Sequence, residues 1–171
     1  MKVGATYLED VVAQFRFLKA LAEKAIARLS DDELFETIDG ESNSVAVIMR
    51  HVGGNLRSRW TEFLTSDGEK PDRWRDTEFE PAASRADVTE IWETGWHVLF
   101  DSLGALKPDD LLKTVHIRSE PHSVVKATNR SLQHTAYHAG QIVFLAKHLR
   151  SADWESLSIA RGQSETFNRR Q

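Results

Sequence analysis

Two histidines four residues apart, His134 and His138, have the type and spacing best suited to chemistry in this chain. Residues four apart lie one above the other on the same face of an α-helix, so two imidazole rings at this spacing can reach one metal ion. They fall on the same stripe as the apolar residues between 124 and 149, which predicts that both rings point inward. An unpaired buried polar group costs about 1–3 kcal/mol. Because one metal ion would satisfy both rings, we predict a metal site on this helix.

A third ligand is needed, because two imidazoles alone hold a metal ion weakly. His51 is the strongest candidate, since it lies in another predicted helix on a face that is unusually polar for a core face. Facing helices of a bundle can bring such side chains to one centre. The sequence leaves open a second interpretation, in which His51 is an interior histidine bonded to a backbone carbonyl. Asn55 and Glu62 share the predicted face of His51, as outer partners of the ligands, as a general base, or as polar residues of the bundle interior.

Two further residues, Arg59 and Gln141, complete the candidate site. Gln141 lies one turn from His138 and can reach the predicted ligands. Arg59 can hold an anionic substrate or pair with a carboxylate, and the ion pair is the expected role. The other histidines lack a paired spacing, and we interpret them as surface or structural residues: His97, His116, His122 and His148.

Composition excludes several other kinds of site. The 171 residues contain no cysteine, which excludes disulfides, thiolate metal ligands and a cysteine nucleophile. The net charge is −4 and no basic block is present, so nucleic-acid binding is not expected. No apolar run approaches the roughly 18 residues of a membrane-spanning helix. We therefore expect a soluble cytoplasmic protein without membrane contacts.

Four segments with helical periodicity must position these residues. The irregular stretch of about twenty residues between the second and third segments is unusual inside a compact domain, and such stretches are often functional. The pattern predicts an all-α fold, an up-down four-helix bundle, in a single domain over residues 1–171 with a tail from about residue 150. Ser44 and Ser84 are the predicted N-caps of two helices, with Asn43 as the alternative to Ser44. The expected helices cover about residues 7–29, 44–64, 85–106 and 124–149.

The chain resembles one known group, the DinB/YfiT-like superfamily, and within it an uncharacterised branch that carries a domain-of-unknown-function label. The resemblance rests on SNSVAVIMRHVGGNLRSRWTEFLTSDGEKP around His51 and on HTAYHAGQIVFLAKHL around His134 and His138, and it covers nearly the whole chain. Members are four-helix bundles, commonly dimeric, with a histidine in helix two and a His-x-x-x-His pair in the last long helix. These three histidines bind a divalent metal, zinc or nickel in many members. The resemblance therefore implies a DinB-like bundle with His51, His134 and His138 as metal ligands.

The resemblance also implies a choice of activities. Some superfamily members use low-molecular-weight thiols such as mycothiol, bacillithiol or glutathione, and others are called metal-dependent hydrolases without a known substrate. Three neutral protein ligands leave open positions on a metal, which suits catalysis. We therefore expect a metal-dependent hydrolase or thiol-dependent S-transferase that acts on a small molecule, as a homodimer whose interface uses some of the five tryptophans. The alternative is a non-catalytic bundle in which the metal is structural, or a stress-related metal-binding protein.

Overall fold

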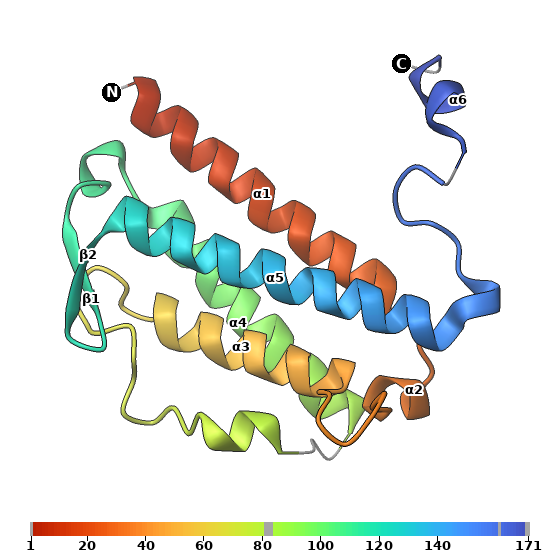
Figure 1. Cartoon of the computed structure of the whole chain (residues 1–171). Helices are drawn as coiled ribbons and strands as arrows, with labels where there is room; N and C mark the ends of the chain where they lie inside the picture. Colours follow the sequence, from red (N-terminus) through yellow and green to blue (C-terminus); the bar gives the residue numbers. More distant parts are fainter. Residues whose placement is uncertain (1, 81–83, 161, 170–171) are drawn as a thin grey trace.

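A computed structural model describes residues 2–80, 84–160 and 162–169 of the chain. These residues form a mostly helical protein with one small antiparallel hairpin (Figure 1). The long helices are α1 (Lys2–Ile26), α3 (Val45–Trp60), α4 (Arg85–Ala105) and α5 (Val124–Arg150). The smaller elements are α2 (Asp31–Phe35), α6 (Ser164–Asn168), β1 (Thr114–Ile117) and β2 (Glu120–Ser123), with 3₁₀ turns at Asp76–Phe79, Pro108–Asp110 and Ser151–Asp153.

Serine side chains cap the N-termini of three of the long helices. Ser44 Oγ accepts a hydrogen bond from the backbone N–H of Val47 at 3.3 Å, and Ser84 Oγ accepts one from Asp87 at 3.2 Å. Ser123 caps α5 in the same way. These bonds satisfy N–H groups that have no partner inside the helix. The N-caps predicted at Ser44 and Ser84 are therefore confirmed.

Helices α1 and α5 run side by side in the same direction (Figure 1). Near their starts, the Tyr7 hydroxyl lies 2.8 Å from Asn129 Oδ1. Just past their ends, the Arg28 guanidinium lies 5.1 Å from the ring centre of Trp154. Contacts between matching ends establish that the first and last long helices of the chain are parallel.

Helices α3 and α4 are also parallel, so the predicted up-down order is wrong. Near their C-terminal ends, Ser102 Oγ donates a hydrogen bond to the Trp60 carbonyl at 2.9 Å. The connection 61–84 is long enough to run back along α3, so that α4 starts at the end where α3 starts (Figure 1). A periodic pattern identifies the buried face of a helix but not its direction, which depends on the path of the connection.

Two glycines allow α3 and α4 to pack closely. A Cβ atom on Gly53 would lie 2.5 Å from the Ile91 carbonyl oxygen, and one on Gly95 would lie 2.7 Å from the Gly53 Cα. Both neighbours are backbone atoms, so a larger residue at either position would push the helices apart. This close contact fixes the part of α3 that carries His51, two residues before Gly53.

The core between the long helices is centred on aromatic side chains. The ring of Phe15 on α1 meets the rings of Trp60 on α3 and Trp96 on α4 edge-on, with 6.3 Å between ring centres in each pair. All three are almost fully buried. The Trp60 indole N–H donates to Ser131 Oγ on α5 at 3.1 Å. One cluster thus joins all four long helices and holds α3 in register with α5.

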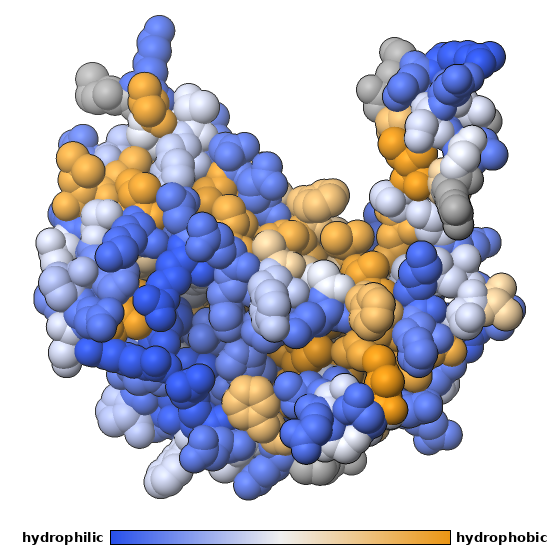
Figure 2. Space-filling view, in the orientation of Figure 1, coloured by the Kyte–Doolittle hydropathy of each residue, from blue (hydrophilic) through white to orange (hydrophobic). Residues whose placement is uncertain are grey.

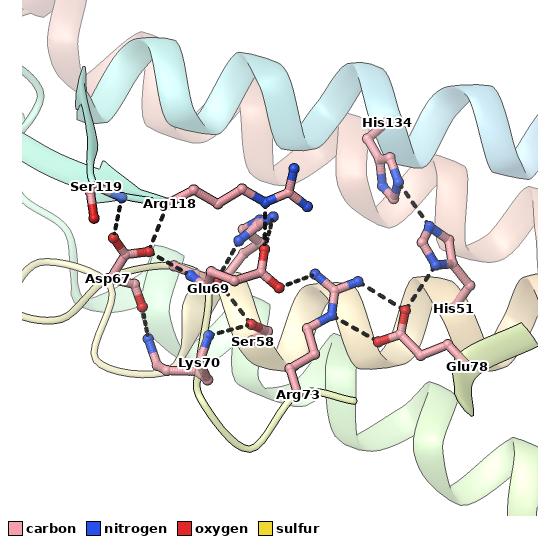
Figure 3. Close-up of polar contacts among 12 residues, drawn as sticks. His51, Ser58, Asp67, Glu69, Lys70, Arg73, Glu78, Arg118, Ser119 and His134 are labelled. Atoms are coloured by element: carbon pink, nitrogen blue, oxygen red, sulfur yellow. Dashed lines mark hydrogen bonds and ion pairs between the residues drawn. The ribbon is translucent and has the colours of Figure 1, made fainter. Parts of the chain in front are cut away.

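The hairpin turn is anchored by Asp67. Arg118 and Ser119 have positive φ angles of 56° and 64°, a conformation that costs non-glycine residues about 1–2 kcal/mol each. The Asp67 carboxylate accepts hydrogen bonds from their backbone N–H groups at 2.8 and 2.7 Å (Figure 3). These bonds offset the strain and attach the turn, with the Arg118 side chain, to the connection that follows α3.

Acid is expected to weaken this anchor. Hydrogen bonds from the backbone N–H groups of Glu69 and Ser119 lower the pKa of Asp67 from 3.8 to about 2. A carboxylate whose pKa is depressed in the folded state contributes stability that is complete above its unfolded pKa and is lost as the pH falls to the folded one. Asp67→Asn should therefore unfold at lower urea concentration than the wild type at pH 7, and this difference should shrink between about pH 4 and pH 2. A constant difference across that window would contradict the anchor.

The described residues that follow α5 leave the helical core. Trp154 and Leu157 still pack partly against it, whereas α6 stands apart from the long helices in Figure 1. The single domain with a tail from about residue 150 stays a prediction. No helix among the described residues has the length and apolar character needed to cross a membrane.

Candidate metal centre

Three histidine nitrogens converge between α3 and α5. His51 Nε2 lies 3.1 Å from His134 Nε2, and His138 Nε2 lies 3.2 Å from the same atom. One nitrogen of each ring lies within 4.8 Å of the other two. Figure 3 shows His51 reaching from α3 towards His134 on α5. The structure therefore brings together the three residues that the sequence predicts as ligands.

Hydrogen bonds determine the tautomers of two of the rings. His51 Nδ1 lies 2.9 Å from Glu78 Oε2, and His138 Nδ1 lies 2.7 Å from Gln141 Oε1. Both partner atoms are oxygen acceptors, so in the neutral rings each Nδ1 carries the proton. In that neutral form the Nε2 atoms of His51 and His138 present lone pairs towards His134.

The His134 ring cannot donate a hydrogen bond to both neighbouring histidines at once. Its Nδ1 is buried and has no hydrogen-bond partner among the described residues. Burial, together with the nearby His138 and His51, lowers the pKa of His134 to about 3, so the ring is neutral at pH 7. A neutral ring can offer one Nε2 proton at most, and two lone pairs face it. A divalent cation would instead accept the Nε2 lone pairs of all three rings.

The spacing of these nitrogens fits such a cation. Zinc–nitrogen bonds of about 2.0–2.1 Å place the nitrogens of a tetrahedral site about 3.3 Å apart. The two closest pairs here are 3.1 and 3.2 Å apart. Imidazole ligands suit zinc and nickel among others. Within the described ranges no fourth histidine, aspartate or glutamate joins the group, so an ion held by these three rings would keep coordination positions for water or a substrate.

Glu78 is a site residue that the sequence did not reveal. It lies in the 3₁₀ turn Asp76–Phe79 of the connection between α3 and α4 and is buried. Burial raises its pKa, but hydrogen bonds from His51 and Arg73 outweigh burial and lower it, so the carboxylate is charged. A carboxylate behind a histidine ligand orients the ring and makes it more basic. The unusual length of the connection was a signal of function in this segment, but it did not point to Glu78.

Neutralising Glu78 is expected to weaken metal binding. Glu78→Gln should lower zinc affinity about 10–100-fold, the usual effect of losing such an outer partner. Gly54→Ala should act in the same direction, because its Cβ would lie 2.5 Å from Glu78 Oε1. Glu80→Gln, which alters an exposed carboxylate two residues away, is the matched control. Calorimetric titration with zinc measures the effect, and equal affinities of Glu78→Gln and Glu80→Gln would contradict this role for Glu78.

Three of the other candidate residues lie beside the clustered histidines. Gln141 contacts the predicted ligand His138 directly, and Asn55 lines a cavity beside His51. Arg59 lines the same cavity and forms an ion pair with Glu69 at 2.9 Å, as the sequence predicted for its role.

Glu62 does not lie on the face of His51. Helix α3 ends at Trp60, and Glu62 follows with a positive φ of 50° and an exposed side chain that lines a different hollow. The prediction for Glu62 is therefore wrong, because it assumed that the helix continues to about residue 64.

A cavity of about 190 Å³ adjoins His51 and His134. Its apolar wall includes Trp60, Phe63 and Ile117, all of which are buried. Asn55 and Ser131 supply polar groups to the same lining. The nitrogen cluster therefore borders a space that a small molecule can enter.

One family model matches the chain over residues 2–163, and its description is "Protein of unknown function (DUF1572)". The chain belongs to this DUF1572 family. The match spans α1 to α5 and therefore contains the three clustered histidines. Comparison with the curated proteins and with the solved structures gives no match. The family description assigns DUF1572 no activity, and the link to the DinB/YfiT-like superfamily stays a proposal.

Proposed function

We propose that this DUF1572 protein is a metal-dependent enzyme that holds one zinc or nickel ion through His51, His134 and His138. The proposal rests on the convergence of the three Nε2 atoms beside a cavity, with two tautomers set by Glu78 and Gln141. Structural zinc sites are usually closed by four protein ligands, whereas catalytic sites have three and an open position. The three-histidine arrangement therefore favours the enzyme over a metal that only joins helices.

A bound divalent ion would supply a nucleophile at neutral pH, either a water whose pKa is lowered to about 7 or a thiol held as thiolate. We accordingly propose hydrolysis of a small molecule, or transfer of a low-molecular-weight thiol to one. Glu78 and Gln141 hold the Nδ1 protons of the ligand rings. Asn55 and Ser131 are placed to hydrogen-bond a substrate in the cavity, while Trp60 limits the access of water.

We also propose that the four long helices form a DinB-like bundle, with α3 and α4 parallel, and that the protein is a homodimer. Two aromatic side chains support an interface on α5: Tyr137 and Phe144 lie two turns apart and are 64% and 66% exposed. Figure 2 shows hydrophobic residues gathered on the face over the second half of α5. Light scattering that gives a monomer mass at micromolar concentration would contradict the dimer. The cytoplasmic location stays a prediction.

Cobalt substitution tests the open site. If coordination positions are free, adding 2-mercaptoethanol or acetohydroxamate should change the visible absorption spectrum of the cobalt-loaded protein. A response to the thiol alone would favour S-transfer, and a response to the hydroxamate alone would favour hydrolysis. A spectrum that neither probe changes would contradict an enzyme with an open metal site.

Chelation is expected to leave the protein folded. The apolar core around Phe15, Trp60 and Trp96 is complete without an ion, so the metal-free protein should keep its helical circular dichroism and unfold cooperatively. Added zinc should raise the unfolding temperature, because it binds the folded state alone. Loss of the helical signal on chelation would instead support the rival function, a structural ion that joins α3 to α5.

A further inference from the structure

The cavity beside the metal centre carries an excess of positive charge. Its lining includes five arginines, which come from α3, the connection 61–84, the hairpin turn and α5: Arg59, Arg73, Arg75, Arg118 and Arg130. Among the described residues, two carboxylates pair with these arginines, Glu69 and Glu78 (Figure 3). Five guanidinium groups against two carboxylates leave three positive charges around the cavity.

Arg73 supplies a buried donor nitrogen that makes no hydrogen bond, although a carboxylate lies within ion-pair distance of it. Its side chain is 4% exposed, and its Nε and Nη2 atoms bond to Glu78 at 2.8 and 2.9 Å. Its Nη1 atom is buried and makes no hydrogen bond within the described chain, and Glu69 Oε1 lies 3.5 Å away. A native structure rarely leaves a buried N–H group without a hydrogen bond. An oxyanion in the cavity would supply the missing acceptor.

Arg75 and Arg130 line the cavity with exposed side chains and form no ion pair with any described residue. Arg130 precedes His134 by four residues on α5, and His134 precedes His138 by four, so the three lie on one face of the helix. An anion held by Arg130 would therefore lie close to the clustered histidines. A guanidinium group binds carboxylate or phosphate through two parallel hydrogen bonds.

The remaining wall suits a short hydrocarbon group. Trp60, Phe63 and Ile117 line it and are 8% exposed or less. The volume of about 190 Å³ is smaller than the roughly 300–1,000 Å³ of pockets for drug-sized ligands. Positive charge and an apolar wall in a small space together select for a small amphipathic anion.

We propose that the molecule bound beside the metal centre is a small organic anion. Arg73, Arg75 and Arg130 hold its carboxylate or phosphate, and its hydrocarbon part lies against Trp60 and Phe63. This inference rests on the proposed metal-dependent function and adds the class of substrate to it. The arginines bind and orient the anion, whereas the histidines hold the metal, so the two parts can be tested separately.

Calorimetric binding of three probes tests the proposal: hexanoate, hexyl phosphate and the neutral hexanamide. Each is titrated into the full chain, once loaded with zinc and once after chelation. Because the arginines are present in both forms, we expect at least one anion to bind about tenfold more tightly than hexanamide in both. The tighter anion distinguishes a carboxylate site from a phosphate site. Equal affinity for all three probes would overturn the proposal.

Two substitutions locate the binding. Arg130→Gln and Arg75→Gln change exposed side chains, so both variants should fold, and each should weaken binding of the anion about tenfold without affecting hexanamide. Arg57→Gln is the matched control, since Arg57 is exposed on α3, pairs with Asp72 and does not line the cavity. Loss of anion binding in the control alone would overturn the proposal.

The outcomes separate this inference from the proposed function. Anion binding that requires zinc and is unchanged in Arg130→Gln and Arg75→Gln would identify the anion as a metal ligand. That result overturns the arginine site and leaves the metal-dependent enzyme standing. Arginine-dependent binding in a protein that takes up no zinc would support the anion site and contradict the proposed function.

Discussion

Replacing His138 with alanine is expected to abolish stoichiometric metal binding. The substitution removes one of three converging nitrogens and leaves His51 and His134, whose Nε2 atoms are 3.1 Å apart, with two ligands between them. The loss should exceed the roughly 10–100-fold effect of removing an outer partner such as Glu78, because a direct ligand is lost. Elemental analysis of protein purified without a metal-affinity tag measures the occupancy.

His148→Ala is the matched control for this experiment. His148 lies on the same helix, is exposed and stands outside the cluster, so its replacement should leave one ion per chain. His138 is half-buried at the edge of the core, and His138→Ala should keep the helical circular dichroism of the wild type. Full occupancy in folded His138→Ala would refute the three-histidine site.

Gly95→Ala is expected to destabilise the protein by about 2 kcal/mol. Its Cβ would lie 2.7 Å from the Gly53 Cα, and backbone atoms cannot rotate away as a side chain can. Overpacking typically costs about 1–3 kcal/mol, here against a gain in helix propensity of about 1 kcal/mol. We place the net loss of folding stability at the upper end of the resulting range, because the whole of α3 must shift. Urea unfolding at equilibrium measures it.

Gly104→Ala on the same helix should have the opposite effect and stabilise the protein. A Cβ at Gly104 meets nothing within 4 Å, so the variant should gain up to about 1 kcal/mol from helix propensity.

Gly95→Ala should also bind zinc more weakly, because displacement of Gly53 moves His51, two residues earlier on α3. Equal unfolding midpoints for Gly95→Ala and the wild type would contradict the close helix contact.

The sequence was sufficient for the parts of the site that follow a helical period. His134 and His138 share a face because they are four residues apart, and His51 lies on a polar face of a separate periodic segment. Ser44 and Ser84 were recognisable as N-caps because capping depends on local chemistry. These features need little knowledge of how distant segments meet.

Two features that the sequence could not supply depend on the path of the connection 61–84. Glu78 reaches His51 across 27 residues, and no periodicity marks its position. The direction of α4 follows from the same path. Glu62 was misplaced for a local reason, since the chain turns into an extended conformation at Thr61 after a helix expected to continue.

The parallel pairing of α1 with α5 has a consequence for how the chain reaches its native state. Tyr7 contacts Asn129 across 122 residues of sequence, so the two helices can dock only after most of the chain has been synthesised. Contacts of such long range form slowly, because a large loop must close before they are made. We therefore expect slower folding than in a bundle of equal size whose successive helices pack in turn. Until α5 leaves the ribosome, part of the apolar stripe of α1 stays uncovered and is a natural target for chaperones.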